Sequence, residues 1–266
     1  MNSNKILIIS LLSIFFLSSC EDVIELDLEN TDPQLVIEGT LDMTSQTAKV
    51  VLTQTNGFYE TAQPVPTENA FVELTAPDGI TYTLDEIEPG VFEVENLSAT
   101  PEDEFQLTVE ANGERYEAAA ITPYPATLDD LNSEEFMFPF GNNENTSYQV
   151  FMNWTDEEAV DNFYRVRTYR NGELIPTNYM ILNDESLEGA VFTLPVRQET
   201  FEKGETVTVE LLSTNEVYYD YFVQLSGLAP GGPGGGATPY NPKGNFSNEA
   251  LGYFGIYSTS SLEIQL

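Results

Sequence analysis

The sequence has no histidine, one cysteine, and only 9 lysine and arginine residues among 266. Without histidine, the chain has no Ser-His-Asp or Cys-His catalytic group, no histidine-ligated metal and no side chain whose ordinary pKa lies near neutrality. A single cysteine cannot form an internal disulfide. The 44 aspartates and glutamates give a formal net charge of −35, which excludes nucleic acid as a partner because phosphate binding needs clustered cations.

The acidity is not that of a disordered tail. Hydrophobic residues make up 41% of the chain and aromatic residues 12%, which is enough to build a packed core. The sequence therefore predicts a folded body with an acidic surface.

The N-terminus has the layout of a bacterial secretory signal. Lys5 precedes an apolar run over residues 6–17, which is too short to span a bilayer. The run ends in Leu17-Ser18-Ser19-Cys20, a lipobox-like motif in which the thiol would receive a diacylglycerol before cleavage. We expect residues 1–19 to be removed and Cys20 to be lipidated. The alternative is a buried cysteine that happens to follow an apolar stretch.

Lipidation would hold the mature chain to a membrane, since each buried CH₂ contributes about 0.8 kcal/mol. No later stretch is apolar enough to cross a bilayer. Residues 20–32 form an acidic linker, in which Glu21 and Asp22 resemble the export signal that sends lipoproteins to the outer face of the outer membrane. We therefore expect a lipid-anchored, surface-exposed outer-membrane protein. The alternative is a solvated linker with incidental charge.

The charge distribution supports a division into two domains. Residues 21–126 contain 23 acids and two cations, whereas residues 127–266 contain 21 acids and six cations. Two prolines bracket Tyr124 near this point, as is common in linkers. We predict domains over residues 33–125 and 126–266.

Residues 33–125 are predicted to be all-β. Asp78-Gly79 and Asn112-Gly113 are hairpin signals, and about seven short strands fit an immunoglobulin-like sandwich. The expected strands are 34–38, 48–54, 70–75, 80–84, 91–94, 105–111 and 115–121. Acidic runs at 85–88 and 102–104 are expected at turns, where solvated acids are favoured over a Ca²⁺ site because the ligand spacing of known loops is missing. No metal site is predicted.

Residues 126–266 are predicted to form a second sandwich, similar to fibronectin type III. Residues 128–145 are expected to be irregular, and Asn171-Gly172 is expected to close a hairpin. The expected strands are 148–154, 163–170, 173–180, 189–196, 205–213, 251–258 and 260–266. The fold class is therefore all-β, with two sandwiches and one inserted helix.

The inserted helix is expected over residues 214–226. Ser213 and Glu216 have the spacing of a capping box, and an aromatic stripe follows at helical spacing. Its tyrosines would stack on sugars or peptides, or the stripe would pack on the sheet. The Gly- and Pro-rich loop over 229–244 lacks a phosphate-binding motif, so no cofactor is predicted.

One strand combines cations with aromatic residues. In an extended segment Phe163, Arg165, Arg167 and Tyr169 share one face. Arg165, Arg167 and Tyr169 are candidate ligand contacts, because guanidinium groups hold carboxylates or phosphates and stack on aromatic rings. The alternative is internal pairing with acids on adjacent strands, such as Glu173 or Glu210.

The chain resembles the outer-membrane lipoproteins of domain-of-unknown-function family 4249. The resemblance runs from Cys20 to the C-terminus. The matching segments are residues 20–27, 33–39, 89–92, 162–166 and 248–255. It implies an accessory lipoprotein encoded beside a TonB-dependent outer-membrane transporter, and it supplies no catalytic residues. The first domain, residues 33–125, is also similar to carboxypeptidase regulatory-like and transthyretin-like modules.

Three functions follow from these observations. The first is a non-enzymatic binding or accessory lipoprotein that docks on, or delivers ligand to, a TonB-dependent channel. The second is a surface glycan hydrolase with paired carboxylates, for which abundant acids give little support. The third is a structural or adhesive surface lipoprotein.

Overall fold

A computed structural model describes residues 32–56, 63–136, 147–156, 160–176, 180–184, 189–196, 200–228 and 240–266. All described strands and helices belong to one compact unit, formed by residues 33–56 and 61–266. Cys20, Glu21 and Asp22 lie outside the described residues, as does most of the Gly- and Pro-rich loop.

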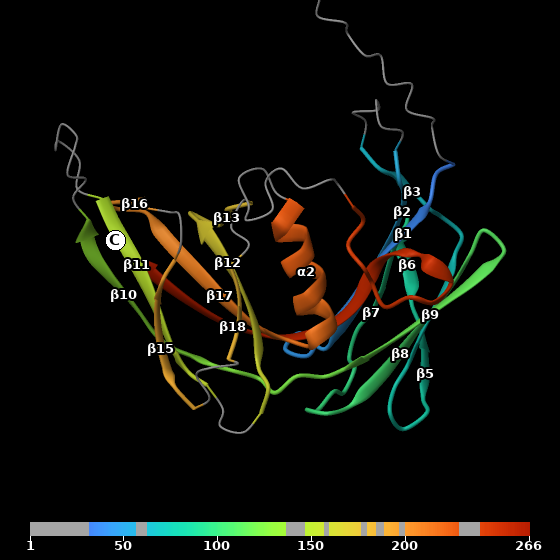
Figure 1. The fold of residues 1–266 in the computed structure, drawn as a ribbon, viewed down its shortest axis with the longest axis horizontal. Helices are drawn as coiled ribbons and strands as arrows, with labels where there is room; N and C mark the ends of the chain where they lie inside the picture. Colours follow the sequence, from blue (N-terminus) through green and yellow to red (C-terminus); the bar gives the residue numbers. More distant parts are fainter. Residues whose placement is uncertain are drawn as a thin grey trace, which may run out of the picture. The chain divides into compact units, whose positions relative to one another are not determined.

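The described strands form three sheets (Figure 1). The largest has ten strands, in the order β13 (Glu173–Leu174), β12 (Phe163–Arg170), β17 (Thr206–Thr214), β18 (Leu251–Gln265), β1 (Leu35–Asp42), β2 (Thr47–Gln54), β7 (Val91–Val94) and β6 (Asp85–Glu88), with β14 (Met180–Asn183) beside β12 and β3 (Val65–Pro66) beside β2. We call it the long sheet.

Each smaller sheet has four strands. The first has the order β5 (Thr81–Thr83), β4 (Phe71–Thr75), β8 (Glu104–Ala111) and β9 (Glu114–Ile121). The second has β10 (Leu128–Phe136), β11 (Ser147–Thr155) and β15 (Val191–Pro195), with β16 (Phe201–Glu202) beside β11. The helical elements are α2 (Glu216–Leu228) and the short 3-10 turn η1 (Ser247–Glu249).

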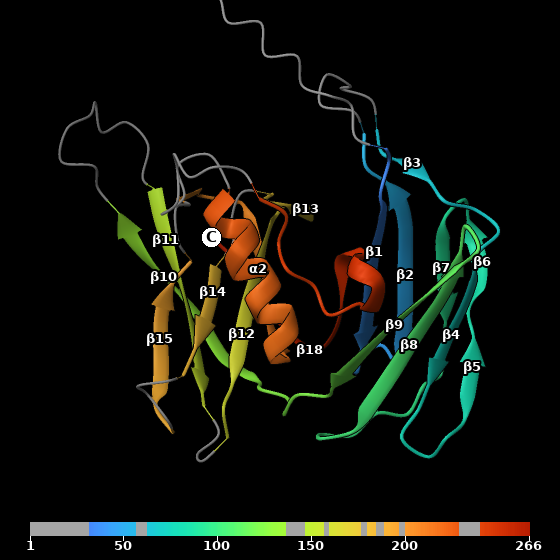
Figure 2. The ribbon, with the colours of Figure 1, turned by 45° about the vertical axis from the view of Figure 1, so that its right-hand side comes forward.

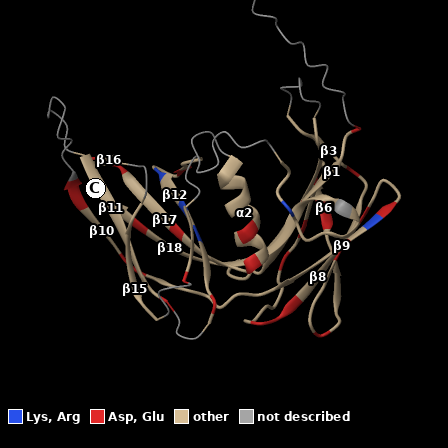
Figure 3. Cartoon of the chain, viewed as in Figure 1, with Lys and Arg blue, Asp and Glu red and all other residues tan. Residues whose placement is uncertain are grey.

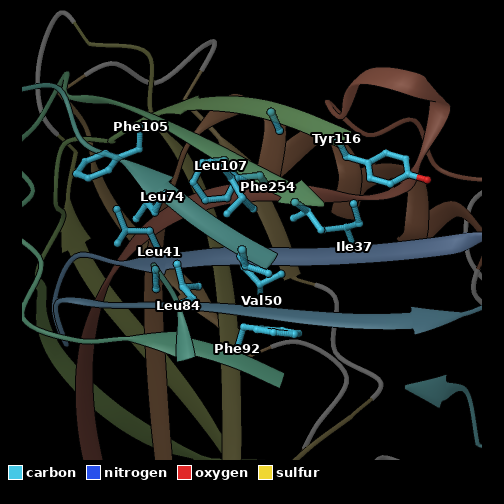
Figure 4. Close-up of a cluster of buried hydrophobic side chains, with 14 of the residues drawn as sticks. Ile37, Leu41, Val50, Leu74, Leu84, Phe92, Phe105, Leu107, Tyr116 and Phe254 are labelled. Carbon is cyan, nitrogen blue, oxygen red and sulfur yellow. The ribbon is translucent and has the colours of Figure 1, made fainter. Parts of the chain in front are cut away.

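Two hydrophobic cores lie between the long sheet and the smaller sheets. The first core joins β1 and β2 to β4, β8 and β9, and Figure 4 shows Phe254 of β18 beside Leu107 and Leu74 within it. The second core surrounds the fully buried Trp154 and includes Val166 of β12. The all-β prediction of two sandwiches is confirmed.

The strand β18 takes part in both sandwiches. Phe254 and Ile256 are buried in the first core, whereas Leu262 and Ile264 pack against the second. These four residues alternate along the strand and therefore point to the same face of the long sheet. This shared strand was not expected from the sequence, and it pairs in parallel with β1 and antiparallel with β17.

The expected hairpins are present. Asn112 and Gly113 have φ angles of 54° and 81° between β8 and β9, the positive values that a tight hairpin turn of this type requires. Asp78-Gly79 joins β4 to β5, and Asn171-Gly172 joins β12 to β13. The turn chemistry therefore predicted strand connections that hydrophobic periodicity alone does not fix.

Besides the two-residue strands β3 and β16, two longer segments form strands where none was expected. Residues 85–88 are β6, a fully exposed edge strand, and an edge tolerates charges because one side faces water. Residues 128–136 are β10, not an irregular segment. An irregularity in the pairing between Leu128 and Asp130 places Leu128 and Leu131, three residues apart, in the core, which hides the two-residue period.

The expectation of two final strands was wrong, because residues 251–265 form one strand. The hydroxyl-rich middle of β18 interrupts the hydrophobic pattern where the chain segment leading into β10 contacts the long sheet. There Ser260 Oγ accepts a hydrogen bond from Leu128 N at 2.9 Å, and Ser213 Oγ of β17 accepts one from Ala126 N at 2.7 Å.

The helix was placed correctly, but its cap was not. Ser213 belongs to β17, and α2 begins after Asn215. The Asn215 side-chain oxygen accepts a hydrogen bond from Tyr218 N at 3.3 Å, which is the N-cap arrangement. The helix also continues through Gly227 to Leu228, beyond its expected end.

Candidate functional site

The helix α2 lies on the face of the long sheet opposite the two cores (Figures 1 and 2). Its Tyr218, Tyr221 and Phe222 form a third cluster with Tyr253 of β18. Close packing here depends on Gly255, because a Cβ atom at that position would lie 2.6 Å from the Tyr218 ring. The aromatic stripe therefore attaches α2 to the sheet. This was one of the two expectations for the stripe, the other being contact with a sugar or peptide.

The tyrosines of this cluster are kept neutral by their surroundings. Burial raises the pKa of Tyr218 and Tyr221, and it raises the pKa of Tyr253 well above the ordinary value. For Tyr218 the nearby charge of Arg165 acts in the opposite direction, but burial outweighs it. The cluster is consequently an uncharged aromatic layer, in which the Tyr218 hydroxyl accepts a hydrogen bond from Arg165.

The candidate ligand residues share one face of β12, as expected, and this face carries α2. Arg165 is enclosed by the helix: one guanidinium nitrogen donates to Tyr218 Oη at 2.6 Å, and its Cζ lies 3.8 Å from the Phe222 ring centre. A cation over an aromatic face is attracted by the ring quadrupole. Arg165 thus joins helix to sheet.

Arg167 has a different environment. Its Nε lies 2.8 Å from Glu210 Oε2 on β17, and the Tyr169 hydroxyl donates to the same oxygen at 3.0 Å. Internal pairing with Glu210 was the alternative expectation, and this ion pair is present. Burial is the largest single influence and lowers the pKa of Arg167, but the charge of Glu210 together with the neighbouring tyrosine side chains outweighs it, so the pKa is raised.

The Arg167 ion pair remains open to water. The Arg167 side chain is 27% exposed and that of Glu210 is 21% exposed. Tyr257 of β18 lies alongside, with its ring centre 5.7 Å from the Arg167 Cζ. We call Arg167, Tyr169, Glu210 and Tyr257 the Arg167 platform. Figure 3 shows the cations of β12 beside α2, in a chain where acidic residues dominate. Ligand contact by this group stays a prediction.

A pair of buried carboxylates at one end of the second sandwich was not predicted from the sequence. Asp156 and Asp184 are 4% and 3% exposed. Asp156 accepts hydrogen bonds from the Tyr164 hydroxyl at 2.5 Å and from Gly189 N at 3.1 Å, and Asp184 accepts one from Asn162 N at 3.0 Å. Both acids directly follow strands, which is the only sequence signal that pointed to them.

The described residues offer little for metal binding. They contain no group of three or more acidic or cysteine side chains that could hold an ion. Two surface hollows of about 490 and 620 Å³ lie at the Asn112-Gly113 and Asp78-Gly79 turns, away from the candidate ligand residues. No helix within the described ranges is long and apolar enough to cross a membrane.

Comparison with known proteins gives a family and a likeness among solved structures. The family described as "Domain of unknown function (DUF4249)" matches residues 21–263. A solved two-domain fibronectin type III segment of chicken tenascin matches 68% of this chain and 91% of its own, with 16% identity and a TM-score of 0.24. No curated protein matches the chain.

Proposed function

Because the chain belongs to the family described as "Domain of unknown function (DUF4249)", whose members it resembles from Cys20 onward, we propose that it is a lipid-anchored accessory or binding protein of the outer membrane, exposed at the cell surface and working beside a TonB-dependent transporter. It acts by contact and not by catalysis. The lipobox-like Leu17-Ser18-Ser19-Cys20 supports the anchor, and Glu21 and Asp22 support export to the outer membrane.

The anchor would restrict where the body can work. Twelve residues separate Cys20 from Pro33, where the folded unit begins. A fully extended chain of this length reaches at most about 45 Å. A lipidated Cys20 therefore keeps the body close to the bilayer, within reach of the exposed loops of a membrane channel.

The Arg167 platform is the observation that supports a contact function. It places a partly exposed ion pair and two tyrosines on paired strands of a large sheet, where the backbone is held by hydrogen bonds to neighbouring strands. Binding groups on a rigid scaffold lose little conformational entropy when a ligand arrives.

Copurification tests the proposed partner. The tagged full-length protein is extracted from envelopes in a mild detergent after brief crosslinking, and bound proteins are identified by mass spectrometry. We expect a TonB-dependent channel in near-stoichiometric amount. Quantitative recovery of the protein without such a channel would contradict the proposal.

The Cys20→Ala variant is the matched control for the anchor. Labelling with a radioactive fatty acid should mark the wild type and not this variant. Protease treatment of intact cells should digest the anchored wild type if it is exposed at the surface. Absence of label on the wild type would refute the lipidated anchor independently of the partner.

A glycan hydrolase is the second candidate, favoured by one observation. Asp156 and Asp184 are both buried near Tyr164, whose ring lies 5.5 Å from that of Trp154. However, both carboxylates already accept hydrogen bonds from main-chain N–H groups, which is a structural use of acids. If Asp156→Asn abolishes glycan cleavage by a correctly folded protein, the hydrolase is the better account.

A further inference from the structure

We propose that the Arg167 platform binds a neutral saccharide through hydrogen bonds to its hydroxyl groups. This inference rests on the proposed binding function and gives it a ligand class. It starts from hydrogen-bonding capacity that the platform leaves unused.

That unused capacity lies on both members of the ion pair. Glu210 Oε2 takes the contacts from both Arg167 and Tyr169, whereas Oε1 accepts no hydrogen bond from the described residues. Arg167 meets Glu210 through Nε and also hydrogen bonds to the Tyr257 side chain, but its terminal nitrogens carry four N–H groups and, within the described part of the chain, pair with no second carboxylate. A strong acceptor and strong donors thus lie side by side on a water-exposed face.

A saccharide satisfies this arrangement better than a ligand that can only donate or only accept hydrogen bonds. Each sugar hydroxyl both donates and accepts, so neighbouring hydroxyls can donate to Glu210 while accepting from Arg167. The Tyr257 ring beside Arg167 offers apolar surface to the C–H groups of a sugar ring. The platform supplies hydrogen bonds and an aromatic surface together.

The charge balance excludes ionic ligands from this position. Glu210 neutralises Arg167, so the pair has no net charge with which to attract an anion. The whole chain carries −35, which repels anions at longer range. A cation would be attracted to the body but would meet the Arg167 guanidinium at the platform. A neutral ligand has neither cost.

The openness of the site predicts weak binding to a single sugar unit. A ligand on a partly exposed sheet face loses less water than one in a closed pocket, so its dissociation constant is expected in the range of about 0.1–10 mM. A polysaccharide presents many such units. Retention by a polymer is therefore a more sensitive measurement than titration with a monosaccharide.

Affinity gel electrophoresis of the full-length protein tests the inference. The protein is kept in a polyoxyethylene detergent, because detergents with sugar headgroups would compete. Separate gels contain amylopectin, dextran, mannan, xylan, alginate or heparin. We expect at least one of the four neutral polymers to retard the protein, and neither of the two anionic polymers to do so.

Substitutions connect the retardation to the platform. Glu210→Gln keeps the shape but weakens the acceptor, and Tyr169→Phe removes one hydroxyl. We expect at least a fivefold loss of apparent affinity for Glu210→Gln and a smaller loss for Tyr169→Phe. Arg115→Gln is the control, because Arg115 of β9 also forms ion pairs, with Glu110 of β8 and Glu117 of β9, and lies outside the platform. Thermal unfolding shows which variants remain folded.

Three results would overturn the inference: no retardation by any neutral polymer, retardation by the anionic polymers alone, or unchanged retardation of folded Glu210→Gln. The failure is separable from that of the proposed function. If the wild-type protein recovers a transporter but binds no polymer, only the saccharide inference is contradicted. If it binds polymer but recovers no channel, only the proposed partner is contradicted.

Discussion

The side-chain amide of Asn245 hydrogen bonds to both main-chain groups of Phe254. Its Oδ1 accepts from Phe254 N at 2.9 Å, and its Nδ2 donates to Phe254 O at 3.1 Å and to Ala119 O at 3.0 Å. One residue therefore links β18 of the long sheet to the edge strand β9. Ser247 and Asn248 bond to further main-chain groups of β9, so this edge is covered.

Replacing Asn245 should loosen the first sandwich. Asn245→Ala removes three hydrogen bonds and leaves partly buried main-chain groups without partners, so we expect a loss of about 2–4 kcal/mol in the free energy of unfolding. Urea unfolding measures it. Asn241→Ala, at an exposed position, is the control and should change the stability by less than about 0.5 kcal/mol. Equal effects of the two changes would contradict the linking role.

Gly252 should tolerate no side chain. Its φ angle is +99°, and a Cβ atom there would lie 2.0 Å from Ile37 O, so the parallel pairing of β18 with β1 would have to shift. We expect Gly252→Ala to cost more than about 3 kcal/mol or to prevent folding.

Gly172→Ala provides the comparison for Gly252. It also has a positive φ, +83°, but a Cβ atom there meets nothing within 4 Å. Only the backbone strain should appear, at about 1–2 kcal/mol. If both substitutions have the same effect in thermal unfolding, the close approach to Ile37 is not what requires glycine.

Asn215 should matter more to α2 than the expected capping box does. Its side-chain oxygen accepts from Tyr218 N and from Ile256 N, so Asn215→Ala should cost about 1–3 kcal/mol. Glu216→Gln alters the exposed residue of the expected box and should cost less than about 1 kcal/mol. Urea unfolding followed by helical circular dichroism compares the two variants. A larger loss of stability for Glu216→Gln would contradict this prediction and favour the capping box.

The buried tyrosines should make the fold sensitive to alkali. Burial raises the pKa of Tyr257 to about 12 and that of Tyr253 well above its ordinary value of 10. The unfolded chain releases these protons first, so it binds fewer protons than the native state once the pH passes about 10. The contribution of these tyrosines to the free energy of unfolding is therefore fully present below pH 10, and it is lost as the pH rises above 10.

The alkaline loss is measurable from unfolding free energies between pH 8 and 12. Each such tyrosine contributes a slope of up to about 1.4 kcal/mol per pH unit, so Tyr253→Phe should reduce the slope by up to that amount. Tyr240→Phe, at an exposed position, should leave the slope unchanged. A flat stability profile to pH 12 would contradict the prediction.

The strands that could be predicted from the sequence are those with unbroken alternation. In β8, Phe105, Leu107 and Val109 mark one buried face, and the turn residues mark its end. The strand β10 escaped prediction because its pairing irregularity puts Leu128 and Leu131 out of phase. The strand β18 was predicted as two strands because hydroxyl residues interrupt its hydrophobic pattern in the middle, where Ser260 bonds to Leu128 at the start of β10, more than 120 residues earlier in the chain.

The candidate site was predictable in part, for a similar reason. Alternation alone places Arg165, Arg167 and Tyr169 on one face. It cannot say that α2 covers Arg165 while Arg167 stays open beside Glu210, because that depends on which distant elements pack there. The buried Asp156 and Asp184 could not be recognised among 44 acids, since their burial depends on loop ends that tertiary packing brings together.

The shared strand has a consequence for how the protein matures. Val36 pairs with Leu251, and every other described strand precedes β18 in the chain. Contacts this distant in sequence form slowly. Neither hydrophobic core can close until residues 251–265 are in place, so both sandwiches stay unfinished until the last described strand has been made. Loss of this one segment would leave two incomplete cores exposed to proteases and to aggregation.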